Sequence, residues 1–129
     1  PDECKRRIKE HIENEYGYDL SMSLDEIRKD YKFDETCQGS VPQAIIAFLE
    51  STDFEDAIRN AISIGGDSDT IAAITWSIAE AAYGIPEDMK EKAYAYLDEP
   101  LKDVLRRWNK YMRGGDESWM KWLIYWMKF

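Results

Sequence analysis

Gly65-Gly66-Asp67-Ser68-Asp69-Thr70 opens the apolar stretch Ile71-Ala72-Ala73-Ile74-Thr75-Trp76-Ser77-Ile78-Ala79, and this junction decides the fold. Two glycines allow a tight backbone turn, and the carboxylates that follow are typical of a helix N-terminus. We therefore predict a helix over about residues 69–83. Because its residues are apolar or small on most sides, this helix is expected to lie at the centre of the domain.

The same junction carries three side chains that suit a metal ion. Asp67, Asp69 and Thr70 offer oxygen ligands, which a hard cation such as Mg²⁺ prefers. The simpler interpretation is a helix N-terminus with an acidic first turn, which the helix dipole favours. Spacing alone leaves both interpretations open.

Helix signals occur along the whole chain, whereas strand alternation is nowhere sustained. Capping boxes are predicted at Ser23-x-x-Glu26, Ser40-x-x-Gln43 and Thr52-x-x-Glu55. Pro42 and Pro86 are expected in first turns of helices, where their missing N–H costs nothing. The sequence predicts a compact, all-α, multi-helix domain with short connections. Its helices are expected at about residues 2–16, 23–31, 41–50, 53–63, 69–83, 86–97, 99–112 and 117–128.

Composition narrows the class of protein. The 129 residues suffice for one domain, and a net charge of −9 argues against direct nucleic-acid binding. With two cysteines and one histidine, the sequence does not support a zinc site or Cys–His catalysis. No apolar run is long enough to span a membrane, so we expect a cytoplasmic protein that binds neither nucleic acid nor membrane.

Four strings in fixed order carry a family resemblance. They are Tyr31-Lys32-Phe33-Asp34-Glu35-Thr36-Cys37-Gln38-Gly39-Ser40-Val41-Pro42, Ala44-Ile45-Ile46-Ala47-Phe48-Leu49, Ala57-Ile58-Arg59-Asn60-Ala61 and Gly65-Gly66-Asp67-Ser68-Asp69-Thr70-Ile71-Ala72-Ala73. Over about residues 1–112 the chain resembles the C-terminal half of the ADP-ribosylglycohydrolase family, whose members hydrolyse glycosidic bonds of ADP-ribose.

The resemblance implies a set of site residues. Asp67, Asp69 and Thr70 match ligands of the family's two-Mg²⁺ site, and Gly65 and Gly66 match the turn that presents them. The segment Gly39-Ser40-Val41-Pro42 falls near the ligand cleft, so Ser40 is a predicted ligand-binding residue. Its simpler interpretation is a helix cap.

The family's second metal motif, a Thr-Asp-Asp run with an acidic catalytic residue, does not occur in the sequence. We therefore expect half of an active site, with the catalytic residue unknown and Mg²⁺ held weakly, or not at all, by the chain alone. Two hypotheses follow. The chain is an enzyme that is completed by a complementing N-terminal half or by a second copy, or it is a non-catalytic module that binds an ADP-ribose-type ligand or a protein partner.

Aromatic residues mark candidate interfaces. Trp76 stands where the family usually carries a small residue, so an indole there would displace whatever helix crosses it. Residues 113–129 are expected to form a separate C-terminal helix with Trp119, Trp122, Leu123 and Trp126 on one stripe. We expect this stripe to pack on its own domain, on another copy or on a partner.

Overall fold

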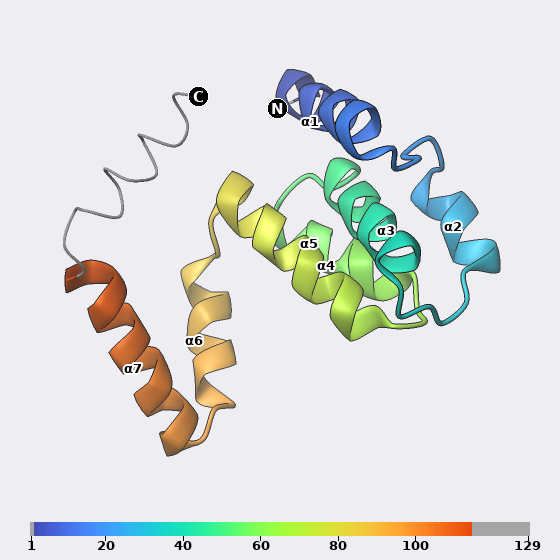
Figure 1. Cartoon of the computed structure of the whole chain (residues 1–129). Helices are drawn as coiled ribbons and strands as arrows, with labels where there is room; N and C mark the ends of the chain where they lie inside the picture. The colour runs from blue at the N-terminus through green and yellow to red at the C-terminus, as the bar shows by residue number, and fades with distance from the viewer. Residues whose placement is uncertain (1, 115–129) are drawn as a thin grey trace. The chain divides into compact units, whose positions relative to one another are not determined.

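The computed structural model describes residues 2–114, and within them seven α-helices follow one another without a strand (Figure 1). The all-α prediction is confirmed. The chain divides into two compact units, residues 1–86 and 87–129. The first unit holds α1 (Asp2–Tyr16), α2 (Leu24–Asp30), α3 (Cys37–Leu49), α4 (Phe54–Ser63) and α5 (Ser68–Tyr83).

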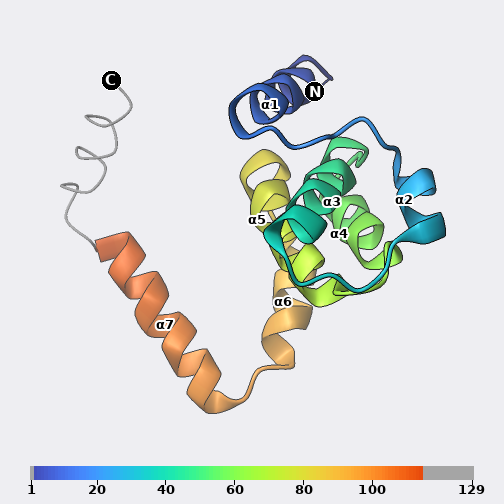
Figure 2. The same ribbon diagram turned by 45° about the vertical axis from the view of Figure 1, so that its right-hand side comes forward.

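Helix α5 is central to the first unit, as the sequence predicts. It packs against both α3 and α4, which also pack against each other, and α2 packs on α3 (Figure 2). Ile71, Thr75 and Ala79 form the buried stripe of α5. The Thr75 hydroxyl lies 3.0 Å from the carbonyl oxygen of Ala44 in α3, which gives this buried polar group a partner. The surrounding core consists of Leu20, Leu24, Ile27, Ala44, Ile45, Ile46, Ala47, Ala61, Ile64 and Ile71.

Side-chain caps set the starts of α2, α3 and α4, and they correct two predictions. The box at Ser23 and Glu26 is confirmed. Helix α3, however, begins at Cys37 because the Thr36 side chain accepts a hydrogen bond from the Gly39 N–H, so the predicted cap at Ser40 is wrong. Pro42 consequently lies inside α3 rather than in its first turn.

The second correction concerns α4. Its N-cap is Asp53, whose carboxylate accepts from the Asp56 N–H at 2.9 Å, so the cap predicted at Thr52 lies one residue too early. Thr52 instead donates its N–H to the Asp56 carboxylate at 2.8 Å. Asp53 thus satisfies one of the free N–H groups that begin the helix, while Asp56 binds the residue before the cap.

The second unit contains α6 (Glu87–Ala95) and α7 (Glu99–Gly114), close to their predicted positions. Helix α7 carries a row of exposed apolar side chains, namely Leu101, Val104, Leu105, Trp108, Tyr111 and Met112. The predicted helix at 117–128, with Trp119, Trp122, Leu123 and Trp126, lies outside the described residues, so it and the boundary predicted at residue 113 remain predictions. None of the helices between residues 2 and 114 is both long and apolar enough to cross a membrane.

Candidate functional site

The N-terminus of α5 presents the predicted metal ligands. Asp67 is the N-cap residue, with φ −80° and ψ 58°, but its side chain makes no capping hydrogen bond. A carboxylate at this position ordinarily accepts from a backbone N–H of the first turn. Asp67 thus occupies the place of a cap without performing the function of one, which leaves its oxygens available for another partner.

The turn before α5 is built from glycine for a geometric reason. Gly65 and Gly66 have φ of +79° and +60°, in the left-handed region that other residues enter at a cost. The Gly65 N–H donates to the Ile62 carbonyl oxygen at 3.2 Å, so the turn also closes the end of α4. Two successive left-handed residues reverse the chain and bring Asp67 to the start of the next helix.

Asp67 and Asp69 lie next to each other. The pKa of the Asp69 carboxyl is below its usual value, first because the Asp67 side chain shares a hydrogen bond with it and second because the backbone N–H groups of Asp69 and Thr70 lie close. A proton between two carboxyl groups occupies a place that a cation can take. Asp67 and Asp69 both stand at the start of α5, one as its N-cap residue and the other in its first turn.

These residues fit a divalent cation in their chemistry, although they form only part of a coordination shell. Two carboxylates and the exposed Thr70 hydroxyl are oxygen donors of the kind that Mg²⁺ selects. In residues 2–114, however, no three His, Cys, Asp or Glu side chains gather as metal ligands. A bound Mg²⁺ would need further oxygen ligands from water or from another protein surface.

The loop between α2 and α3 runs beside this turn (Figures 1 and 2). The sequence does not predict the contact that Tyr31 of this loop makes with the turn. Its ring lies against Gly66, and its hydroxyl donates to the carbonyl oxygen of Gly39 at 2.8 Å. Burial raises the pKa of Tyr31, and the negative charges of Asp34 and Asp67 raise it further. No local pattern signals this contact, because it joins residues 35 positions apart.

Asp34 and Gly39 form the other end of the loop. A Cβ on Gly39 would lie 2.2 Å from the Asp34 Cγ, so only glycine fits there. The Asp34 carboxylate accepts from the N–H and the hydroxyl of Thr36, at 2.8 and 2.7 Å, which lowers the pKa of Asp34. Ser40, the predicted ligand-binding residue, is buried, and its hydroxyl donates to the Thr36 carbonyl oxygen at 2.8 Å. Its ligand contact remains a prediction.

A pocket of about 460 Å³ adjoins the loop. The Oε1 atom of Gln43 in its wall is buried and has no hydrogen-bond partner among the described residues, so a ligand with a donor group could satisfy it. The lining residues are Asp30, Tyr31, Lys32, Phe33, Asp34, Gln38, Gly39 and Gln43.

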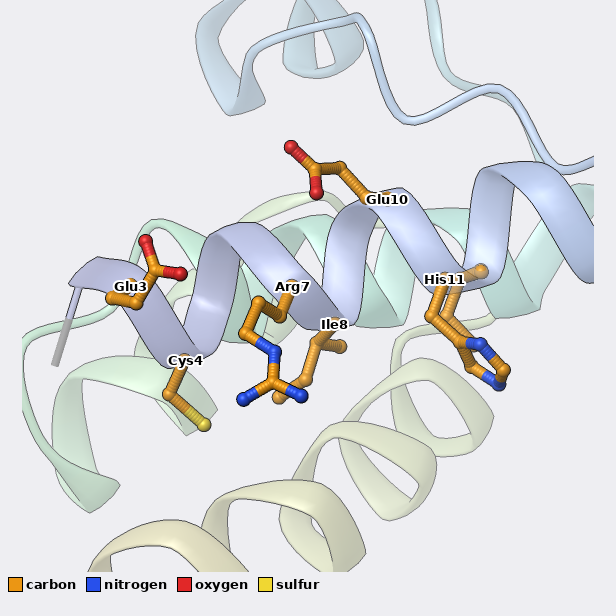
Figure 3. Close-up of a pocket in the computed structure, with 7 residues that line it drawn as sticks. Glu3, Cys4, Arg7, Ile8, Glu10 and His11 are labelled. Carbon is orange, nitrogen blue, oxygen red and sulfur yellow. The ribbon is translucent and has the colours of Figure 1, made fainter.

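A second pocket, of about 960 Å³, lies along α1, and none of the predicted site residues lines it. Figure 3 shows Cys4, Arg7, Ile8 and His11 pointing to one side of α1 and Glu10 to the other. Within the described residues a single helix lines this pocket, which is too little to define a binding site.

Trp76 is half-buried and packs edge-on against Phe54 of α4, with ring centroids 5.0 Å apart. The indole therefore covers a buried ring of its own unit. The interface role predicted for Trp76 stays a prediction.

Comparisons with known proteins identify the family to which the chain belongs. Residues 3–117 match the sequence model of the ADP-ribosylglycohydrolase family. The match extends past residue 112, so it is not confined to the C-terminal half that the resemblance suggested. An uncharacterized protein of Archaeoglobus fulgidus is 39% identical over 62 residues, which are 46% of this chain and 20% of that protein. No solved structure matches the chain.

Proposed function

The chain belongs to the ADP-ribosylglycohydrolase family, and from this premise we propose that it supplies Asp67, Asp69 and Thr70 to a Mg²⁺ site that hydrolyses ADP-ribosyl glycosidic bonds. Residues 1–112 are the part that carries this role, and residues 113–129 are a separate segment. No residue is assigned as the general acid or base.

One observation supports the metal site above the others. Asp67 stands at a helix N-cap with no capping hydrogen bond and beside a second carboxyl group, that of Asp69. Two adjacent carboxylates repel each other unless a proton or a cation lies between them. An aspartate selected only for capping at position 67 would accept a hydrogen bond from the backbone, as Asp53 does at the start of α4.

The residues of the chain have defined tasks in this proposal. Gly65 and Gly66 form the turn that presents the acids. Asp67 and Asp69 would hold the cation through their carboxylate oxygens, and the Thr70 hydroxyl would be a third oxygen donor. When bound, Mg²⁺ orients the ribose and polarises a water molecule. The overall reaction adds the hydroxyl group of a water molecule to the anomeric carbon, while the bond to the modified group breaks and the leaving group takes the proton.

The remaining ligands would come from a second surface, either a complementing N-terminal half or another copy. The chain alone is then inactive or binds Mg²⁺ weakly, because three ligands fill half of an octahedral shell. We place the protein in the cytoplasm, where Cys4 and Cys37, both free in the structure, would stay reduced.

A non-catalytic interaction module is the second candidate, and α7 favours it. Leu101, Trp108 and Tyr111 are 52%, 58% and 70% exposed, an apolar row that suits contact with a protein. In this alternative the chain keeps the fold of the family and binds an ADP-ribose-type ligand or a protein without turnover.

The decisive experiment is an assay with Mg²⁺ on ADP-ribosyl-arginine and ADP-ribosyl-serine peptides, with calorimetry for ADP-ribose binding. The enzyme hypothesis predicts turnover, alone or with a complementing half, that Asp67→Asn and Asp69→Asn abolish. Asp53→Asn is the matched control, because asparagine still caps α4. Binding without turnover, unaffected by Asp67→Asn, would instead identify an interaction module.

A further inference from the structure

Tyr31 and Gly66 are in close steric contact. A Cβ built on Gly66 would lie 2.6 Å from Cε1 and 3.0 Å from Cδ1 of the Tyr31 ring, and 3.3 Å from the carbonyl oxygen of Lys32. By contrast, a Cβ on Gly65 would meet nothing within 4 Å. One face of the turn is therefore packed against an aromatic ring, while the residue before it faces open space.

The ring is itself held at its far end. The Tyr31 hydroxyl donates to the Gly39 carbonyl oxygen at 2.8 Å, in the first turn of α3. Gly39 in turn lies against Asp34, which accepts two hydrogen bonds from Thr36. Tyr31 thus joins the start of α3 to the turn before α5 through a ring whose two ends are both fixed.

Asp67 depends on this turn because no capping hydrogen bond to the backbone directs its side chain. The backbone direction leaving Gly66 therefore sets the direction of its carboxylate. The carbonyl oxygen of Asp67 accepts from the Ile71 N–H at 3.1 Å, so a shift of the turn would change the backbone torsion angles at Asp67 and redirect its carboxylate relative to Asp69. Small changes in ligand direction matter for Mg²⁺, which demands near-octahedral geometry.

We propose that Tyr31 is a positioning residue, whose ring fixes the Gly65-Gly66 turn and thereby the direction in which Asp67 meets a divalent cation. The inference rests on the proposed function, since it concerns the same metal site. It assigns a role to a side chain that is not itself a ligand and that lies 36 residues before the acid it positions.

The test measures Mn²⁺ binding to the full chain by electron paramagnetic resonance of the free ion, well below the unfolding temperature. Tyr31→Ala should weaken Mn²⁺ binding about tenfold, the size of effect seen for residues that orient metal ligands. Tyr31→Phe keeps the ring against Gly66 and should retain most of the affinity. Tyr31→Leu preserves bulk for folding but lacks the flat ring, so it should weaken binding as well.

Tyr18→Ala is the matched control, because Tyr18 is a half-buried aromatic that packs on the same core. It should lower the unfolding temperature without changing Mn²⁺ affinity. If Mn²⁺ binds, is lost in Asp67→Asn, and is equally affected by Tyr31→Ala and Tyr18→Ala, the positioning role is overturned while the metal site stands. If Asp67→Asn leaves Mn²⁺ binding unchanged, the metal site itself fails and the positioning role falls with it.

A double-mutant cycle tests the contact without a metal. Gly66→Ala should destabilise the unmodified chain through both its positive φ and the Tyr31 ring. In a Tyr31→Ala background the backbone strain and the contact with the Lys32 carbonyl oxygen remain but the ring does not, so the loss in unfolding temperature should be smaller. Equal losses in the two backgrounds would show that the ring does not constrain Gly66 and would overturn the proposal.

Discussion

The Lys5 ammonium donates a hydrogen bond to the carbonyl oxygen of Leu49 at 3.1 Å, and this contact joins the first helix to the last residue of α3. The same ammonium donates to the Ser51 carbonyl oxygen and lies 5.2 Å from the ring centre of Phe48. A lysine at this place satisfies carbonyl groups that a helix C-terminus leaves free. The contact indicates how a charged amphipathic helix is attached to an apolar core.

Lys5→Met should therefore destabilise the protein by about 1–2 kcal/mol, through lost hydrogen bonds and a lost cation–π contact. Arg6→Met is the matched control, because among residues 2–114 Arg6 pairs only with Glu3 and Glu10, on the exposed side of α1. Such surface pairs contribute little to stability. Chemical denaturation of the two variants measures the difference, and equal effects would contradict the role given to Lys5.

Asp67→Ala should leave the free energy of unfolding unchanged or raise it, because Asp67 makes no capping bond and stands beside another carboxyl group. Asp53→Ala should instead lower the free energy of unfolding by about 1 kcal/mol, since the Asp53 side chain makes a capping hydrogen bond. Thermal unfolding of both variants at neutral pH provides the comparison. A larger loss for Asp67→Ala than for Asp53→Ala would indicate a structural role and count against the metal site.

Gly39→Ala should destabilise the protein by about 1–3 kcal/mol, although alanine normally favours a helix, because its Cβ would overlap Asp34. In an Asp34→Gly background the overlap is gone, and the same substitution should become neutral or stabilising. Urea denaturation of the four variants measures the interaction. A simple additive result would mean that the two residues do not make the contact described.

The pKa of Asp34 should rise in Thr36→Val, because the hydroxyl that donates to its carboxylate is the first cause of its lowered value. Since the native pKa lies below that of the unfolded chain, ionised Asp34 stabilises the loop above the unfolded pKa. This stabilisation is lost as pH falls through the native pKa. Carbon-13 NMR titration of the carboxyl group measures the shift, and Thr36→Ser, which keeps the hydroxyl, should show little change.

Sequence patterns were sufficient where a structure depends on neighbours in the chain. The box at Ser23 and Glu26, the glycine turn and the apolar helix after it are all local, and they are found as predicted. The start of α3 differs from the prediction because its N-cap is Thr36, which is followed three residues later by Gly39 and so lacks the capping-box pattern that Ser40 and Gln43 show. The Thr36 cap wins because its hydroxyl meets the Gly39 N–H while Asp34 fixes the loop before it.

The environment of the candidate site could not be predicted in the same way. Contact between Tyr31 and Gly66 depends on how α3 and α5 pack, and neither residue carries a periodic or capping signal for it. Similarly, Trp76 packs edge-on against Phe54, a contact that its place in the sequence does not signal. Both contacts arise from tertiary packing, which a motif scan does not report.

The turn before α5 implies that folding and function constrain different residues of the same motif. In a library randomised over residues 65–69, a screen for stable protein should return glycine at Gly65 and Gly66, because left-handed backbone penalises every other side chain there. The same screen should return a variety of residues in place of Asp67, because its carboxylate makes no capping hydrogen bond. Aspartate would return at that position only when the screen demands a bound cation.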